Sequence, residues 1–156
     1  MVGDGSYLMM SQEIVTAVQE GIKVNIILIN NHGFASIGGL SESLGGEGFG
    51  TRYLARDETS GQLDGEKLPV DFAANARSLG AHVIETKTIL DFRLALEEAK
   101  KQTHTTVIYV ETDREERVGG YESWWDVPVA ETSDMKSVED AYRNYTESKK
   151  KERYFL

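Results

Sequence analysis

The chain has 156 residues, of which 40% are hydrophobic and 28% are charged, and its formal net charge is −9. This length and composition are typical of one globular domain with a sizeable core. The negative charge argues against a general nucleic-acid surface, which needs a basic patch. The sequence has no apolar segment long enough for a membrane span and no cysteine, which excludes disulfide and thiolate chemistry. We therefore expect a cytoplasmic protein without nucleic-acid or membrane partners.

The first element in chain order is a tight glycine turn, Gly3-Asp4-Gly5. Ser6 stands where it can cap a following helix, which we predict over Tyr7 to Glu20. Lys23 to Ile29 reads as a buried strand because it is an almost continuous apolar run. The polar sequence Asn30-Asn31-His32-Gly33 follows that strand directly. Strand and helix thus alternate from the beginning of the chain.

The remaining sequence continues this alternation after a long segment, residues 30–67, that has no sustained periodicity and is predicted as a loop. Phe92, Leu96 and Ala99, together with Ile89, are expected on the inward face of one helix. The alternation predicts an α/β fold, a doubly wound and mostly parallel sheet with helices on both faces. The predicted elements are a helix over 69–79, a strand over 82–85, a helix over 89–101, a strand over 105–111, an irregular segment over 113–131 and a helix over 134–150.

The glycine turn and the paired asparagines are separated by 24 residues and follow neighbouring predicted strands. Open parallel sheets bind their ligands at the carboxyl ends of the strands, so both segments are expected at one site. Mg²⁺ is usually bound by one or two carboxylates together with substrate phosphates. Asp4 could supply the charge, Asn31 a neutral side-chain oxygen and Gly33 a backbone carbonyl. An Asp-Gly pair is also ordinary turn chemistry, so Asp4 alone could be only a turn residue.

The turn, helix, strand and asparagine pair together resemble the thiamine diphosphate signature, G-D-G followed by N-N at this spacing. The resemblance assigns Asp4 and Asn31 as metal-binding side chains and Gly33 as the residue that gives its carbonyl to the metal. It implies thiamine diphosphate and Mg²⁺ as cofactors. The positions that it implies for cofactor binding are Gly3, Asp4, Gly5, Ser6, Asn31, Gly33 and Phe34.

Two further segments are similar to one branch of these enzymes, the 3D-(3,5/4)-trihydroxycyclohexane-1,2-dione hydrolases of inositol breakdown. They are residues 33–53, with Gly33 to Leu40 at their start, and residues 122–131. The resemblance implies hydrolytic cleavage of a C–C bond in a cyclic 1,2-dione. Ile37 stands where the pyruvate decarboxylase branch has an acidic residue, which argues against that branch. A domain of another thiamine diphosphate enzyme, decarboxylase or acetolactate synthase-like, and a non-catalytic α/β nucleotide-binding module remain alternatives.

Only Met1 and Val2 precede the glycine turn, which is too little for a central strand. We therefore expect residues 1–156 to be the C-terminal, diphosphate-binding domain of a longer chain, lacking most of its first strand. The resemblance places the activating glutamate on a separate pyrimidine-binding domain of the same or a neighbouring subunit. No catalytic residue is then expected in this chain, which should be inactive alone and act within a homo-oligomer on a small-molecule substrate.

A few other residues are weaker candidates. His32 could contact phosphate or substrate, and Arg52 could contact a hydroxyl-rich substrate, although a turn position and a surface ion pair are the simpler interpretations. Glu13 could reach a partner domain or be merely solvated. Trp124 and Trp125 are expected to anchor their loop against a neighbouring domain or subunit.

Overall fold

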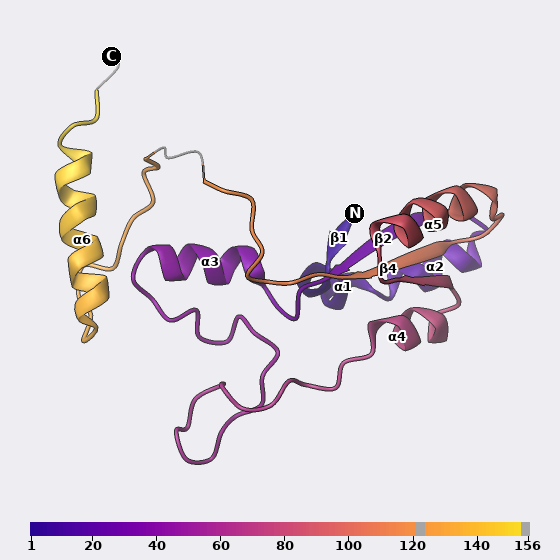
Figure 1. The fold of residues 1–156 in the computed structure, drawn as a ribbon, viewed down its shortest axis with the longest axis horizontal. Coiled ribbons are helices and arrows are strands. Elements are labelled where there is room, and N and C mark those ends of the chain that lie inside the picture. Colours follow the sequence, from indigo (N-terminus) through magenta and orange to yellow (C-terminus); the bar gives the residue numbers. More distant parts are fainter. Residues whose placement is uncertain (121–123, 154–156) are drawn as a thin grey trace.

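The computed structural model describes residues 1–120 and 124–153. Its centre is a sheet of four strands in the order β1-β2-β4-β3, and every neighbouring pair is parallel (Figure 1). The predicted α/β fold with a parallel sheet is therefore confirmed. The strands are β1 (Val2–Gly3), β2 (Asn25–Asn30), β3 (His82–Thr86) and β4 (Thr106–Glu111). The first strand is present as two residues that pair with Leu28 and Ile29 of β2.

Helices cover both faces of this sheet, as the alternation predicted. They are α1 (Asp4–Met10), α2 (Glu13–Gln19), α3 (Ala35–Ser43), α4 (Phe72–Ser78), α5 (Ile89–Lys101) and α6 (Lys136–Lys149). In Figure 1, α4 and α5 lie on opposite sides of the strands, whereas α3 and α6 lie away from the sheet, beyond the carboxyl ends of the strands. The segments that contain α3 and α6 therefore lie at the edge of the sheet where such folds bind their ligands.

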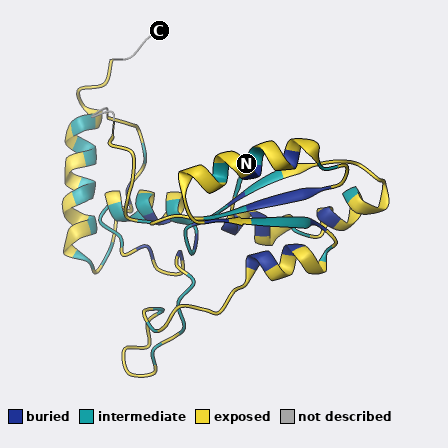
Figure 2. Ribbon diagram, turned by 45° about the vertical axis from the view of Figure 1, so that its right-hand side comes forward, coloured by how far each residue is buried: buried dark blue, intermediate teal, exposed yellow. Residues whose placement is uncertain are grey.

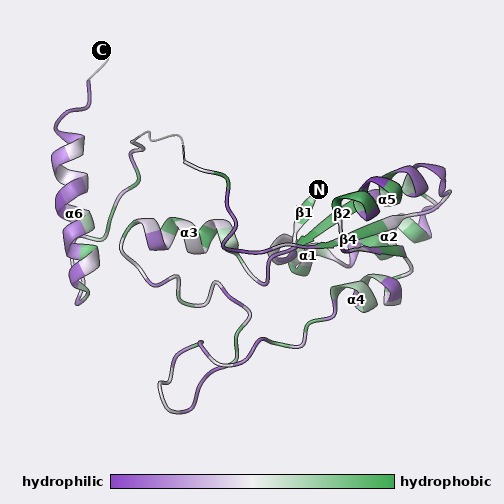
Figure 3. Cartoon of the chain, viewed as in Figure 1, coloured by the Kyte–Doolittle hydropathy of each residue, from purple (hydrophilic) through white to green (hydrophobic). Residues whose placement is uncertain are grey.

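Two hydrophobic cores follow from the two-residue period of the strands. Leu28 of β2 and Val107 of β4 point to one face and pack with side chains of α1, α2 and α4. Their neighbours Ile27 and Ile108 point to the other face and pack against α5. The apolar strands between these layers are visible as green arrows in Figure 3 and as the buried centre of the molecule in Figure 2.

Helix α5 has the predicted boundaries because a capping box fixes its start. The Thr88 hydroxyl accepts from the Asp91 amide at 3.1 Å, and the Asp91 carboxylate accepts from the Thr88 amide at 2.9 Å. Its inward face was predicted with one error. Ile89 is 75% exposed, whereas Ala95 and Ala99 are buried, because the helix meets the sheet only after its first turn.

The helix predicted over 7–20 is instead two helices, α1 and α2. Between them the chain makes i→i+3 bonds, from the Ile14 amide to the Ser11 carbonyl and from the Val15 amide to the Gln12 carbonyl. Ser6 is not the cap: α1 begins at Asp4, its N-cap is Gly3 without a side-chain bond, and Ser6 is exposed within the first turn. Helix α1 therefore starts directly at the end of β1.

Two other predictions need correction. The segment 30–67 is not all loop, since it contains α3, whose glycines hid the helical pattern. Helix α4 begins at Phe72 rather than near Pro69, because the Asp71 carboxylate accepts from the Ala74 amide at 2.8 Å and caps the helix there.

Helix α6 has no buried residue, and its less exposed residues include Val138, Ala141, Tyr142 and Tyr145. Trp124 stacks on Tyr145 with ring centroids 6.3 Å apart, so it anchors its loop to α6 of the same chain. Trp125 is 71% exposed. Within residues 1–120 and 124–153, no helix is long and apolar enough to cross a membrane. Glu122 and Ser123, part of the second family-like segment, lie outside the described residues.

Candidate functional site

The candidate site lies at the carboxyl ends of the parallel strands, where the two predicted motifs meet. Asp4 follows β1 directly and Asn31 follows β2, and these two strands are hydrogen-bonded neighbours. The sequence spacing is therefore the length of one crossover through α1 and α2. This places the turn of Asp4 beside the asparagine pair.

The Asp4 carboxylate joins the two segments through backbone amides. Asp4 is 1% exposed. Its Oδ2 accepts from the Gly33 amide at 2.9 Å and from the Asn31 amide at 3.2 Å, and its Oδ1 accepts from the Gly5 amide at 2.7 Å. Three amide donors stabilise a buried carboxylate that would otherwise carry a large desolvation cost. Asp4 thus holds the loop after β2 in place and brings a negative charge to it.

The side chains of Asn30 and Asn31 differ in their hydrogen bonding. Asn30 is satisfied within the protein: its Oδ1 accepts from the His32 amide at 3.0 Å, and its Nδ2 donates to the Tyr109 hydroxyl at 2.8 Å. The Oδ1 atom of Asn31 is buried and has no hydrogen-bond partner among the described residues. A buried polar atom without a partner is unusual, and beside the Asp4 carboxylate this oxygen is available to a cation.

Gly33 can only be glycine in this arrangement. Its φ is +147°, and a Cβ atom there would lie 2.2 Å from the carbonyl oxygen of Thr51. His32 before it has a φ of +59°, a conformation that is uncommon for residues other than glycine. Such backbone strain occurs at functional sites more often than elsewhere. The loop after β2 is therefore bent sharply around the position of Asp4.

Gly5 is needed for a different reason, which is its contact with Phe34. A Cβ atom at Gly5 would lie 2.5 Å from the Phe34 ring. The ring of Phe34 also packs edge-on against Tyr53, with centroids 6.1 Å apart. Phe34 thus lies over the glycine turn and closes it from one side. Of the predicted cofactor-binding residues, Asp4, Gly5, Asn31, Gly33 and Phe34 form one cluster of contacts, and Gly3 directly precedes Asp4. Ser6 is exposed and lines a separate groove beside α1, α2 and β1.

These residues fit a hard divalent cation held against a diphosphate. No group of three or more His, Cys, Asp or Glu side chains that could hold a metal exists in the described part of the chain. A site built from Asp4, Asn31 and the Gly33 carbonyl needs no such group, because Mg²⁺ takes many of its ligands from phosphates and water. The unpartnered Asn31 oxygen is the observation that favours a ligand here.

The negative charge of Asp4 also acts on Tyr53. Burial, followed by the negative charge of Asp4, raises the pKa of Tyr53 to about 12 from 10.0. Its hydroxyl is buried without a hydrogen-bond partner among the described residues. The Tyr53 side chain therefore stays neutral at neutral pH, and burial costs its hydroxyl group the hydrogen bonds that it would make with water.

Tyr53→Phe is expected to stabilise the fold by about 1 kcal/mol, because it removes a buried hydroxyl that bonds to none of the residues in 1–120 and 124–153. Thermal unfolding at neutral pH measures this. A raised tyrosine pKa in the folded state also means that stability falls as pH rises from 10.0 through about 12. That fall should be shallower in Tyr53→Phe. Destabilisation by Tyr53→Phe at neutral pH would contradict the assignment.

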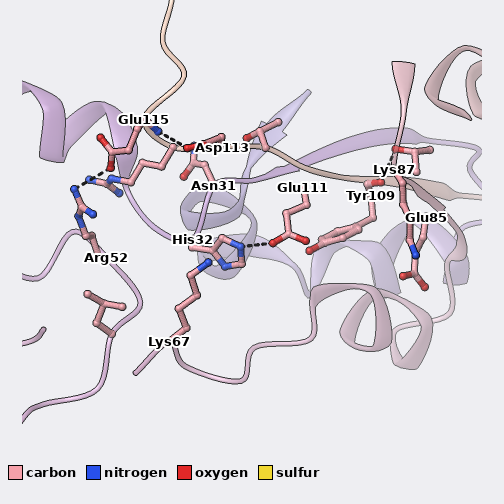
Figure 4. A pocket seen from close by; sticks show the side chains of 14 residues that line it. Asn31, His32, Arg52, Lys67, Glu85, Lys87, Tyr109, Glu111, Asp113 and Glu115 are labelled. Atoms are coloured by element: carbon pink, nitrogen blue, oxygen red, sulfur yellow. Dashed lines mark hydrogen bonds and ion pairs between the residues drawn. The ribbon is translucent and has the colours of Figure 1, made fainter. Parts of the chain in front are cut away.

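A cavity of about 680 Å³ opens beside Asn31 along the ends of β2, β4 and β3. Figure 4 shows His32 and Glu111 in its middle, joined by a contact of 2.5 Å between His32 Nε2 and Glu111 Oε1. Its walls carry charges of both signs, which suits a ligand with many hydroxyl groups better than an apolar one. The charged residues that line it are Arg52, Lys67, Glu85, Lys87, Glu111, Asp113, Arg114 and Glu115.

The weaker sequence candidates are distributed as follows. His32 lines this cavity, and Arg52 lines it while pairing with Glu115 at 3.0 Å, so its simpler interpretation as an ion-paired residue fits. Glu13 does not line this cavity; it lines an apolar groove beside α1, α2 and β1.

Sequence reasoning missed three residues that shape the site, namely Thr51, Tyr53 and Arg114. Thr51 and Tyr53 pair with the loop after β2: the Phe34 amide donates to the Thr51 carbonyl at 2.8 Å, and the Tyr53 amide donates to the His32 carbonyl at 3.0 Å. Arg114 donates to Thr51 from the segment after β4. The signal in the sequence was the glycine-rich stretch that ends at Gly50-Thr51, but its contacts are long-range.

Comparison with known proteins identifies the class to which this fold and site belong. The family model described as thiamine pyrophosphate enzyme, C-terminal TPP binding domain, matches residues 1–110. The chain therefore belongs to the family of C-terminal thiamine pyrophosphate-binding domains of thiamine pyrophosphate enzymes.

Within this family, the chain is 39% identical over 155 residues to 3D-(3,5/4)-trihydroxycyclohexane-1,2-dione hydrolase 2 of Bacillus cereus, covering 99% of the chain and 24% of that protein. It is 42% identical over 150 residues to 3D-(3,5/4)-trihydroxycyclohexane-1,2-dione hydrolase of Geobacillus thermodenitrificans, covering 96% of the chain and 24% of that protein. The chain thus spans about a quarter of the length of these relatives. The resemblance noted in the sequence is confirmed.

A solved structure with a similar fold is the thiamine diphosphate-dependent 4-hydroxybenzoylformate decarboxylase of Rhodococcus jostii RHA1. Its TM-score is 0.57 at 27% identity, over 74% of this chain and 20% of that chain. Benzoylformate decarboxylase from Polynucleobacter necessarius gives a TM-score of 0.56 at 25% identity, over 73% and 19%. Sequence identity is thus higher to the hydrolases than to these decarboxylases.

Proposed function

We propose that this chain is the Mg²⁺- and diphosphate-holding part of a thiamine diphosphate-dependent enzyme that hydrolytically cleaves a C–C bond of a cyclic 1,2-dione in myo-inositol breakdown. The observation that carries the proposal is the buried, unpartnered Oδ1 of Asn31, next to the Asp4 carboxylate in a chain of the thiamine pyrophosphate-binding family. Identity of 39–42% to the hydrolases over nearly the whole chain supports the choice of reaction.

In this proposal the residues of the chain bind and orient. Asp4 supplies the charge for Mg²⁺, and Asn31 and the Gly33 carbonyl supply neutral oxygens. Gly3, Gly5 and Ser6 form the turn that faces the diphosphate, and Phe34 closes it. When bound, thiamine diphosphate supplies a sink for the electron pair of a carbonyl carbon.

The cavity of about 680 Å³ is the proposed substrate site, and its mixed charges suit a polyhydroxylated ring. Carboxylates such as Glu85 and Asp113 accept from hydroxyl groups, while Lys67 and Lys87 donate to them. The hydrolases to which the chain is similar are named for a trihydroxycyclohexane-1,2-dione, a molecule of this kind. A site for an aromatic oxoacid, as in the structural neighbours, needs fewer such groups.

We also propose that a pyrimidine-binding domain, of the same or a neighbouring subunit in a homo-oligomer, covers the outer face of α1 and α2. These two helices expose Leu8, Met9, Met10, Val15 and Val18 by 44–65%. An apolar groove of about 370 Å³ runs between these helices and the edge of β1. Exposed apolar surface of this kind is typical of an interface.

The ligand is tested by comparing thermal shifts of the full-length protein with thiamine diphosphate and with ADP, each with Mg²⁺. A ligand that binds only the folded state raises its stability. We expect thiamine diphosphate with Mg²⁺ to raise the melting temperature and ADP with Mg²⁺ to leave it unchanged. A larger increase with ADP would favour the nucleotide-binding module. The reaction is tested by offering 3D-(3,5/4)-trihydroxycyclohexane-1,2-dione and benzoylformate, and turnover of benzoylformate only would favour the decarboxylase alternative.

The 156-residue chain by itself is expected to give no measurable ring opening, even with excess thiamine diphosphate and Mg²⁺. Positioning and proton transfer each contribute large factors to rate, and the proposal assigns the activating glutamate to the partner domain. The measurement is the rate of the chain beside that of the full-length protein. Turnover at about a hundredth of the full-length rate would show that the acid–base group lies within these residues.

A further inference from the structure

Arg114 lies where the segment after β4 passes beside α3. Its Nη1 donates to the Thr51 carbonyl at 3.1 Å and its Nη2 donates to Thr51 Oγ1 at 3.3 Å. Both nitrogens of the guanidinium fork therefore contact one residue, a geometry that lysine cannot reproduce. Burial lowers the pKa of the Arg114 guanidinium, which indicates that the group is partly withdrawn from water.

Thr51 is the residue against which the loop after β2 is bent. Its carbonyl accepts from the Phe34 amide at 2.8 Å, so this oxygen is shared between Phe34 and Arg114. The same oxygen lies 2.2 Å from the position of a Cβ atom on Gly33. Thr51 is 8% exposed and is held from its other side by a bond from Oγ1 to the Gly48 carbonyl at 2.6 Å.

The loop after β2 is thus held from two directions. Asp4 binds the amides of Asn31 and Gly33 from the side of β1. Thr51 binds the amide of Phe34 from the opposite side. Thr51 therefore restrains, through Phe34, the same loop that carries the predicted metal ligands Asn31 and Gly33.

Helix α3 is built to admit this arginine. A Cβ atom on Gly38 would lie 2.2 Å from Arg114 Nη2 and 2.6 Å from Thr51 Oγ1. Gly39, next along the helix, makes room for a different arginine, since its Cβ would lie 2.6 Å from Arg117 Nη1. Arg117 pairs with Glu42 at 3.3 Å. The glycine pair within α3 therefore serves two guanidinium groups, of which one reaches Thr51.

We infer that Arg114 is a positioning residue, which holds the metal-binding loop in its bent conformation through Thr51. Position 38 is glycine because a side chain there would displace the Arg114 guanidinium. The inference rests on the proposed function for the identity of the ligand, but the restraint on the loop is a property of the protein without ligand. Arg114 acts here on the ligands of the metal and not on the metal itself.

The test compares two variants with two matched controls in the full-length protein. Arg114→Met removes the bonds to Thr51, and Gly38→Ala places a Cβ atom against both the Arg114 guanidinium and Thr51 Oγ1. The controls are Arg117→Met and Gly39→Ala, which make the equivalent changes at the neighbouring contact between Gly39 and Arg117. Hydrogen exchange of the Gly33 and Phe34 amides is measured without cofactor, and thiamine diphosphate affinity is measured as a function of Mg²⁺ concentration.

We expect Arg114→Met and Gly38→Ala to speed exchange at the two amides about tenfold and to raise the Mg²⁺ concentration for half-maximal binding by a similar factor. Arg114→Lys should recover part of both effects, because an ammonium reaches one of the two oxygens. The control variants should stay within about twofold of the parent in both measurements.

Unchanged exchange in Arg114→Met would overturn the inference. If exchange is unchanged while cofactor affinity falls, Arg114 contacts the ligand directly, and the positioning role is also wrong. Exchange needs no ligand, so faster exchange in a protein that does not bind thiamine diphosphate would support the restraint and refute the proposed function instead.

Discussion

Asp4→Asn is expected to abolish Mg²⁺-dependent binding of thiamine diphosphate by the full-length protein, with an affinity loss of about a hundredfold or more. Asp4 is the only full negative charge among the predicted metal ligands. Asparagine is nearly isosteric. Its single oxygen can still accept from the Asn31 and Gly33 amides, so the loop should keep its bend, and only the bond from the Gly5 amide is lost. Calorimetric titration with and without Mg²⁺ measures the effect, and Asn31→Ala should give a smaller loss.

Asp57→Asn is the matched control for this experiment. Asp57 also accepts from backbone amides, those of Thr59 and Ser60 at 2.8 Å, and these bonds lower its pKa. It lies in an exposed turn and does not line the cavity beside Asn31. Its replacement should leave Mg²⁺ dependence intact. Equal Mg²⁺ dependence in Asp4→Asn and in the parent protein would mean that Asp4 is only a turn residue.

Gly33→Ala is expected to cost both stability and cofactor binding. A Cβ atom at this position meets the Thr51 carbonyl oxygen at 2.2 Å and Arg52 Cα at 3.0 Å, and both are backbone atoms that cannot rotate away. The φ of +147° adds strain of about 1–3 kcal/mol for a residue other than glycine. We expect a lower melting temperature and thiamine diphosphate affinity reduced about tenfold or more.

Gly61→Ala separates these two causes. Gly61 also has a positive φ, +69°, but a Cβ atom there meets nothing within 4 Å. It should lower stability through backbone strain alone and leave cofactor affinity unchanged. If Gly33→Ala loses no more affinity than Gly61→Ala, then the close approach of Thr51 to the loop does not matter for binding.

The elements that were predicted well are those with local signals. Helix α5 has its capping box between Thr88 and Asp91 and its apolar period within one short stretch, so its boundaries could be read directly. Strand β2 is an apolar run between polar ends. Helix α3 was missed because Gly38 and Gly39 lower its helical propensity. A Cβ atom at either position would lie against Arg114 or Arg117, and these arginines follow much later in the chain.

The same division holds for the site. The sequence by itself predicted that Asp4 lies beside Asn31 and Gly33, because consecutive parallel strands joined by one crossover are neighbours in most such sheets. It also determined the family, through segments similar to the dione hydrolases. Only the tertiary structure decided that Asn30 is satisfied while the Asn31 oxygen is not, and that Thr51 holds the bend at Gly33. Those facts depend on atoms from strands and loops distant in sequence, and no local pattern specifies which of them meet.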